Sequence, residues 1–304
     1  MKKNRKIGTM VALLAFCGGA HAAFKDPLWS ARVAALGGAF TAVGDDAEAA
    51  FYNPAAAVDM ETQAVSFSYA KLFAGLDDVN LSLNQLAYVQ PVDSFGVITA
   101  GWGSVTAGGL RREDTLILSV AHMFRNIKYV GPVSAGVGVR FLSQSYTLDE
   151  RTRNDPVFQD GSTKKSWAVD AHLFSPSVGL GESALSGGIS FRGINRPNVG
   201  FYEEEKLPLE VALGVLYKWR KISVPVDIVR RGADVTPQVG VEASFMENNL
   251  ALRAGSDTHQ IGTGLGYVYP LNSDLSLSFD YAFLWPLDLK DSSGSHRVTL
   301  GIKF

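Results

Sequence analysis

The stretch LEVALGVLYK, from Leu209 to Lys218, decides the fold class. Its odd-numbered positions are all leucine, valine or tyrosine, whereas its even-numbered positions carry glutamate, alanine, glycine, leucine and lysine. Successive side chains of a β-strand point to opposite faces. The stretch therefore predicts a strand with one apolar face and one mixed face.

Comparable segments follow one another from about residue 62 to the last residue, and turn-forming clusters separate them. We expect fourteen antiparallel strands in an all-β chain, and an even number of strands suits a closed barrel. The predicted strands cover residues 62–73, 79–90, 95–104, 114–124, 132–147, 165–175, 184–193, 208–219, 222–231, 236–246, 249–256, 260–269, 274–285 and 295–304.

The connections between the predicted strands differ in length according to the side on which they fall. Short connections lie near 91–94, 220–221, 247–248 and 270–273, and long ones lie near 147–164, 194–207 and 286–294. All the long connections fall on one side of the predicted sheet. Short periplasmic turns and longer external loops are typical of a transmembrane β-barrel.

The strands of a soluble β-sandwich or propeller would also alternate between apolar and polar residues. The alternation alone therefore leaves open which face points outward. Aromatic residues near the predicted strand ends favour the membrane barrel, because they match the girdles at membrane interfaces. These residues are Trp102, Trp167, Tyr217, Trp219, Tyr267, Tyr269 and Trp285. The terminal Phe304, at the end of an amphipathic strand, resembles the recognition signal for the barrel assembly machinery. We therefore expect outer-membrane lipid and that machinery as partners.

Residues 1–22 have the pattern of a secretory signal peptide. Lys2, Lys3, Arg5 and Lys6 precede an apolar stretch, and the small-residue site Ala20-His21-Ala22 follows it. We expect the mature chain to begin at Ala23 and to reside in the outer membrane of a Gram-negative bacterium.

The only cysteine, Cys17, lies inside the predicted signal peptide, so thiol and disulfide chemistry is not expected in the mature chain. Acylation of Cys17 as in a lipoprotein is the alternative, which the bulky Phe16 before it disfavours. A net charge of −2 without a long basic tract argues against a nucleic-acid partner. After the signal no apolar run is long enough for a spanning helix.

Residues 23–60 do not alternate, and residues 61–304 form the predicted barrel. The first segment contains ALGGAFTAVGDD, from Ala35 to Asp46, followed by AEAAFYNPA, from Ala47 to Ala55. The acidic pair would favour the first turn of a short helix over Ala47–Tyr52. Asn53 precedes a proline, which disfavours continuing that helix.

These motifs resemble the N-terminal hatch of the FadL family of outer-membrane channels, and among its members the short PorV-like ones. The resemblance rests on the glycine pair, the acidic pair and the Asn-Pro-Ala element. It implies a luminal hatch over residues 23–60, with a gating role for Gly37, Gly38, Asp45, Asp46, Asn53 and Pro54. The alternative is a periplasmic cap.

Glycines on the polar strand faces would give a hatch room to pack against the wall. They are Gly136, Gly138, Gly262, Gly264 and Gly266. The alternative role of these glycines is strand bending and turn geometry.

The polar strand faces also carry charges of both signs, which are costly inside a narrow lumen unless paired or hydrated. They are Arg140, Asp170, Arg192, Glu210, Asp227, Glu242, Arg253, Asp280 and Arg297. We expect them to pair with each other or with the hatch, where Asp45, Asp46 and Glu48 are the expected partners of luminal arginines. Solvated charges without a specific partner are the alternative.

Motifs for catalysis, metal binding or phosphate binding are missing. Asp170 and His172 share a strand face and could belong to a luminal hydrolase site, but no nucleophilic serine can be assigned to them. We therefore expect neither enzymatic activity nor a cofactor.

The sequence and the resemblance together favour passive uptake of small hydrophobic molecules, such as fatty acids or aromatics, past a hatch. A non-conducting scaffold of the PorV type, serving protein secretion or surface attachment, is the competing hypothesis, and an unplugged general porin is a third. An apolar pocket from hatch to wall would favour the transporter. A filled lumen with the loop Asn198–Tyr202 exposed would favour the scaffold.

Overall fold

The computed structural model describes residues 23–25, 27–75, 80–127, 131–150, 152, 155–289 and 292–304. The predicted signal peptide, residues 1–22, lies outside the described residues.

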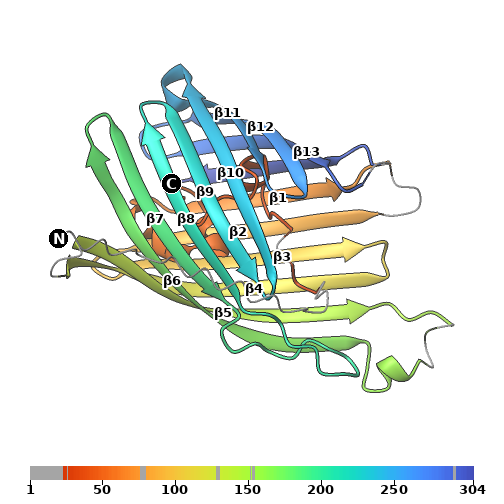
Figure 1. Cartoon of the computed structure of the whole chain (residues 1–304). Coiled ribbons are helices and arrows are strands. Elements are labelled where there is room, and N and C mark those ends of the chain that lie inside the picture. The colour runs from red at the N-terminus through yellow and green to blue at the C-terminus, as the bar shows by residue number, and fades with distance from the viewer. Residues whose placement is uncertain are drawn as a thin grey trace, which may run out of the picture.

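Fourteen antiparallel strands form a closed barrel in which each strand pairs with its neighbours in sequence and β1 pairs with β14 (Figure 1). The strands are β1 (Ala64–Leu72), β2 (Leu81–Val92), β3 (Gly96–Ala107), β4 (Arg111–Ile127), β5 (Gly131–Tyr146), β6 (Thr163–Leu180), β7 (Ser183–Arg192), β8 (Glu210–Trp219), β9 (Ile222–Arg231), β10 (Asp234–Phe245), β11 (Leu250–Ser256), β12 (Gln260–Pro270), β13 (Ser276–Pro286) and β14 (Ser295–Lys303). The predicted fold class and strand number are confirmed.

Two strands are longer than predicted. β4 begins at Arg111 and β6 ends at Leu180, whereas the predicted segments were 114–124 and 165–175. The residues added at the start of the two strands, 111–113 in β4 and 163–164 in β6, are polar, so hydrophobic alternation does not mark them although the backbone ladder continues. In β6 the pairing register shifts between Ser175 and Val178, around Pro176, which cannot donate to the ladder.

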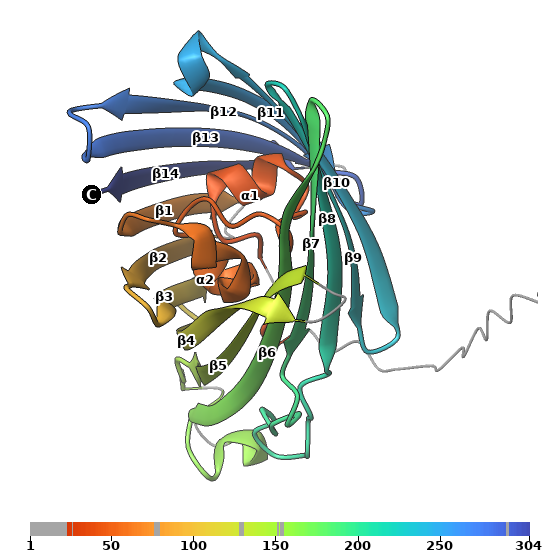
Figure 2. The same cartoon turned by 90° about the vertical axis from the view of Figure 1, so that its left-hand side faces the viewer.

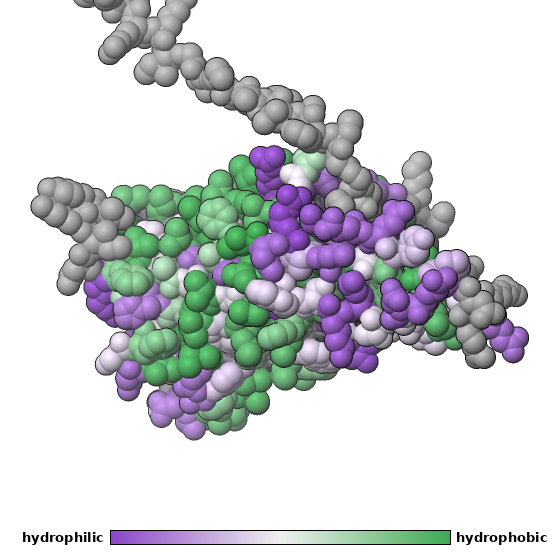
Figure 3. All heavy atoms as spheres, turned by 90° about the horizontal axis from the view of Figure 1, so that it is seen from below, coloured by the Kyte–Doolittle hydropathy of each residue, from purple (hydrophilic) through white to green (hydrophobic). Residues whose placement is uncertain are grey.

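The closed topology decides which face points outward. Leu213, Val215 and Leu300 are about half exposed on the outer surface, whereas Asp227 and Arg297 are buried on the inner face. The apolar faces thus surround the barrel and the polar faces line its lumen. The outer surface in Figure 3 accordingly shows a broad hydrophobic area. This is the arrangement of a transmembrane barrel.

The barrel has two unlike ends. One, here called the turn end, carries the short β2–β3, β8–β9 and β10–β11 connections, and the other, the loop end, carries the long β5–β6 and β7–β8 connections. Phe304 lies at the turn end, where its backbone N–H donates to the carbonyl of Gln63 at 3.0 Å and its side chain is exposed.

Residues 27–60, here called the luminal segment, lie inside the barrel (Figure 2). They contain α1 (Ala31–Ala35), α2 (Ala49–Tyr52) and the 3-10 helix η1 (Pro54–Asp59). Two further 3-10 turns, η2 (Pro156–Phe158) and η3 (Met246–Asn248), lie in connections between strands. No helix among the described residues has the length and apolar character needed to cross a membrane.

Local sequence explains the path of the luminal segment. The Ser30 hydroxyl accepts a hydrogen bond from the N–H of Val33 and caps α1, and Gly37 and Gly38 leave the helix with positive φ angles of 65° and 89°. The predicted second helix begins two residues later than expected, at Ala49, because Asp46 instead accepts from the Glu48 N–H in a turn.

Candidate functional site

Glycines on the inner wall seat the luminal segment. A Cβ on Gly262 would lie 2.3 Å from the Ala34 carbonyl oxygen, and one on Gly255 would lie 2.3 Å from the carbonyl carbon of Leu36. Gly101, Gly188, Gly214, Gly240 and Gly264 likewise have atoms of residues 31–53 within 3 Å of such a Cβ. Any side chain at these positions would push the segment off the wall.

Of the five glycines singled out from the sequence, Gly262 and Gly264 contact the segment most closely. A Cβ on Gly136 would lie 3.6 Å from Ala55, an ordinary contact. Gly138 and Gly266 face side chains of neighbouring strands instead, namely Ser119 and the Asp280–Arg253 pair.

Asn53 joins the luminal segment to itself and to the wall. Its Nδ2 donates to the backbone oxygens of Thr41 at 2.8 Å and of Leu173 in β6 at 3.1 Å, and its Oδ1 accepts from the Ala55 N–H at 3.1 Å. The side chain is fully buried. Pro54 follows at the first position of η1, where its missing N–H costs nothing.

Two charged wall residues hold the backbone of the segment. The Asp227 carboxylate in β9 accepts hydrogen bonds from the N–H groups of Phe40 and Thr41 at 3.0 and 2.8 Å. Arg297 in β14 donates to the carbonyl oxygens of Leu28 and Pro27.

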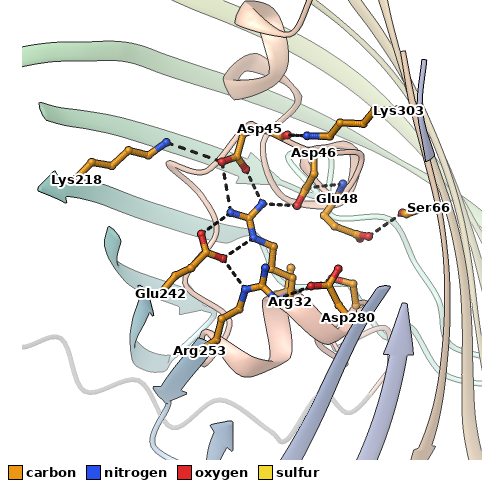
Figure 4. A network of polar contacts seen from close by, with 12 residues as sticks. Arg32, Asp45, Asp46, Glu48, Ser66, Lys218, Glu242, Arg253, Asp280 and Lys303 are labelled. Atoms are coloured by element: carbon orange, nitrogen blue, oxygen red, sulfur yellow. Dashed lines mark hydrogen bonds and ion pairs between the residues drawn. The ribbon is translucent and has the colours of Figure 1, made fainter. Parts of the chain in front are cut away.

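A network of charges at the turn end centres on Arg32 of α1 (Figure 4). Its guanidinium lies 2.6 Å from carboxylate oxygens of both Asp45 and Asp46 and 3.0 Å from Glu242 in β10. Arg253 in β11 joins the network by contacting Glu242. Bidentate pairs of this kind are the stronger ion pairs in proteins.

We expected Asp45 and Asp46 to pair with arginines of the barrel wall, and this prediction is wrong about the arginine involved. Both carboxylates take Arg32, which belongs to the same segment, and the wall contributes Lys218 at 3.9 Å from Asp45 and Lys303, which donates to the Asp45 carbonyl. Sequence reasoning missed Arg32. Its isolation as a single cation in an apolar helix beside an acidic pair was the available signal.

Burial and neighbouring charges shift the pKa values of the acidic residues in this region in different directions. Burial alone would raise the pKa of Asp45, but the Arg32 guanidinium holds it well below its usual range. Burial raises the pKa of Glu48 to about 8, and the nearby Asp46 adds to the rise. Glu48 accepts hydrogen bonds only from neutral groups among the described side chains, Ser66 at 2.7 Å and Gln85 at 2.9 Å.

The remaining predicted luminal charges are also paired. Arg140 binds Asp170 at 2.7 and 3.0 Å, Arg192 binds Glu210, and Arg253 also contacts Asp280. All nine predicted charges thus lie on the inner wall and contact either each other or the luminal segment.

The geometry of Asp170 and His172 does not form a catalytic triad. His172 lies 3.0 Å from the Ser190 hydroxyl, a serine that the sequence did not single out, but Ser190 donates to the Tyr52 carbonyl and is fully buried. Asp170 is engaged by Arg140 and the Gly193 N–H. Of these three residues, Ser190 links the wall to the luminal segment, whereas Asp170 and His172 bond to groups of the wall and of the β7–β8 connection.

A cavity of about 680 Å³ lies between the luminal segment and the loop end of the barrel. Leu28, Gly38, Thr41 and Tyr52 of the segment contribute to its lining. Its apolar wall lining comes from Leu72, Phe73, Val229, Val235, Pro286 and Leu289, and polar lining comes from Arg192, Arg231, Gln238, His259 and Arg297. The cavity therefore extends from the segment to the wall, with many apolar side chains and several charged ones around it.

The other half of the loop end is covered. Ala23 and Phe24 pack with Leu142, Ala168 and residues of the β7–β8 connection, and Arg231 donates to both of their carbonyl oxygens. In that connection Val199 is buried and Tyr202 is exposed. The loop Asn198–Tyr202 thus turns Val199 inward and leaves Tyr202 exposed, so it matches the exposed loop expected of a scaffold only in part.

Comparisons with known proteins define the class of fold. No family model matches the chain, and no curated protein matches it in sequence. Among solved structures, the toluene transporter TbuX of Ralstonia pickettii superposes with a TM-score of 0.58 at 12% identity, covering 92% of this chain and 99% of TbuX.

The toluene transporter TodX of Pseudomonas putida gives a TM-score of 0.57 at 12% identity and covers 90% of this chain and 96% of its own. A FadL homologue of Pseudomonas aeruginosa gives 0.54 at 13% identity, with coverages of 91% and 97%. The chain therefore has the fold of the FadL-like outer-membrane barrels, as the resemblance in its N-terminal motifs implied.

Proposed function

We propose that this protein is a passive channel in the outer membrane of a Gram-negative bacterium, through which small hydrophobic molecules enter. The observation that carries the proposal is the cavity of about 680 Å³ whose apolar lining runs from Leu28 in the luminal segment to Leu72, Phe73 and Val229 in the wall. A pocket of this size and lining suits a small apolar ligand. The similar structures of toluene transporters support the same class of ligand.

In this proposal the luminal segment acts as the hatch. It packs against strands on opposite sides of the barrel, α1 against β11–β14 and η1 against β3–β6, so a straight aqueous path is blocked. Gly37 and Gly38 follow α1 and have positive φ angles. Because glycine adopts such angles without steric cost, these two residues would let the segment move while α1 stays intact.

Uptake by cells that lack their own channels for hydrophobic compounds tests the function. Cells expressing the chain should take up a labelled monoaromatic or fatty acid but not a small sugar. Deletion of residues 37–55 should admit the sugar as well. If wild-type cells take up neither compound, the scaffold hypothesis replaces the channel, and if they take up both, the barrel is a general porin.

The scaffold remains the second candidate function because polar contacts tie the luminal segment to the wall at several points, as the network around Arg32 illustrates. A partner protein that co-purifies with the barrel while no hydrophobic compound is taken up would favour it.

A further inference from the structure

A row of outward side chains crosses the seam where β14 pairs with β1 and closes the barrel. The strands β13, β14, β1 and β2 lie side by side there (Figure 2). Strand register places four residues next to one another, here called the seam row: Phe283 in β13, His296 in β14, Lys71 in β1 and Ser82 in β2. Lys71 and His296 are exposed, whereas Ala70 and Arg297, one position along the same strands, are buried in the lumen. The seam row therefore lies on the outside of the barrel.

Aromatic residues place the seam row at the level of the membrane surface. On β13, Trp285 is the next outward residue toward the loop end and Tyr281 the next toward the turn end. On β1, Tyr69 is the next outward residue toward the turn end. Tryptophan and tyrosine concentrate where a membrane meets water, and the long loops of a transmembrane barrel face the outside. The seam row therefore faces the head groups of the outer leaflet.

The two basic residues of the row face each other without an acid between them. Lys71 and His296 are directly opposite across the β1–β14 ladder. Among the described residues neither side chain has an acidic partner. Basic side chains directly opposite each other repel when both are charged. An anion that contacts both would remove this repulsion.

Contacts with β13 orient the His296 ring in advance of any ligand. Its Nδ1 lies 2.7 Å from the Tyr281 hydroxyl, and its ring centroid lies 5.2 Å from that of Phe283. With the hydroxyl as donor to Nδ1, a neutral imidazole carries its proton on Nε2. An Nε2–H is a donor for an anion, and the Ser82 hydroxyl two strands away is another.

Toward the turn end the same strands present a large apolar surface. Leu300 in β14, Phe67 in β1 and Leu86 in β2 share one row, and each is 44–54% exposed. Apolar side chains at this depth lie against acyl chains. A molecule that contacts both this surface and the seam row therefore needs an anionic head and apolar chains.

From these observations we infer that the seam row is a binding site for a phosphorylated glycolipid of the outer leaflet. Lys71, His296 and Ser82 contact a phosphate group, and the acyl chains lie along the apolar surface below them. Lysine binds phosphate as a point charge, and the imidazole N–H and the hydroxyl add directed hydrogen bonds. The site lies outside the barrel wall. It rests on the outer-membrane location in the proposed function and is independent of what the lumen conducts.

A nearby cation in the same register row supplies a matched control. The register continues from Ser82 to Thr106 in β3 and to Arg112 in β4. Arg112 donates to both carboxylate oxygens of Asp114, at 2.8 and 2.9 Å. Because its charge is already paired, Arg112 should contribute little to the binding of an anion.

Native mass spectrometry of the purified barrel in detergent tests the site without any transport. Titration with lipid A that carries its phosphates should give a saturable complex, and lipid A stripped of its phosphates should bind more weakly. Lys71→Gln and His296→Phe should each raise the Kd about fivefold, the effect of losing one interfacial cation or one hydrogen bond. Arg112→Gln should leave the Kd unchanged.

Two results would overturn the inference. One is an equal Kd for the lipid with and without phosphates, a comparison that needs no variant and so does not depend on how a variant folds. The other is wild-type affinity in both Lys71→Gln and His296→Phe. Displacement of the lipid by excess inorganic phosphate would assign the row to a free anion and refute the lipid site. The channel function is measured separately, by uptake, and stands or falls without these results.

Discussion

Asn53 and Gly188 meet where the luminal segment touches the wall. Asn53 Nδ2 donates to the Thr41 carbonyl, and a Cβ on Gly188 would lie 2.2 Å from that carbonyl oxygen and 2.8 Å from Nδ2. The hydrogen bond therefore exists only because position 188 lacks a side chain.

Gly188→Ala should detach the luminal segment from β7. We expect a loss of about 1–3 kcal/mol in the stability of the seated segment, since the added methyl overpacks a backbone contact. Faster cleavage of residues 27–60 by protease added to the purified barrel would report it. Gly187→Ala is the control, because its Cβ would point outward with Gly214 O at 3.7 Å as the nearest atom. Equal cleavage of the two variants would contradict the prediction.

Asn53→Leu keeps the branched shape of the side chain but removes both donors and the cap of η1. It leaves the carbonyls of Thr41 and Leu173 without this buried partner, which costs about 1–3 kcal/mol for each unsatisfied group. The variant should admit sugars in the uptake assay that the wild type excludes. Asn53→Asp, which keeps the acceptor for the Ala55 N–H, should retain η1 but not the wall contact. Wild-type exclusion of sugars by Asn53→Leu would show that other contacts suffice.

Arg32→Met should destabilise the seated segment more than any other single charge removal in the network. It leaves Asp46 and Glu242, whose side chains are only 19% and 11% exposed, without their shared cation, and breaking such a largely buried pair costs about 3–5 kcal/mol. The thermal unfolding temperature in detergent measures the loss. Lys218→Met is the control, because Lys218 is 43% exposed and 3.9 Å from Asp45, so its removal should have little effect.

Glu48 should make the seating of the segment weaken as pH rises from about 5 to 8. Its pKa is raised by burial from 4.5 to about 8, so the folded state holds a proton over this range that the unfolded state has released. Stability then falls with pH by at most ~1.4 kcal/mol per pH unit and levels off above the folded pKa.

Thermal unfolding measured between pH 5 and 9 checks this slope. Glu48→Gln, which cannot ionise and can still accept from Ser66 and bond to Gln85, should remove the decline. An identical decline in the wild type and the variant would assign the pH dependence to another group.

Much of the fold was predictable because strand formation in this chain is marked locally. Alternation such as that of Leu209–Lys218 reflects a period of two that each strand carries by itself, and all fourteen strands follow from it. The polar loop-end extensions, such as Thr163 and Lys164 in β6, lack an apolar face and so gave no such signal. The nine luminal charges were predictable for the same reason, since each lies on the polar face of an alternating strand.

Partners across the lumen were not predictable, because contact there depends on closure of the barrel. The sequence by itself determined the strands, the two kinds of face and a non-alternating segment of small residues before them. Only the tertiary structure decided that Arg32 pairs with Asp45 and Asp46 and that Gly188 makes room for Asn53. Those relations join residues far apart in sequence, and they arise from strand register and closure of the barrel, neither of which a local pattern of polarity contains.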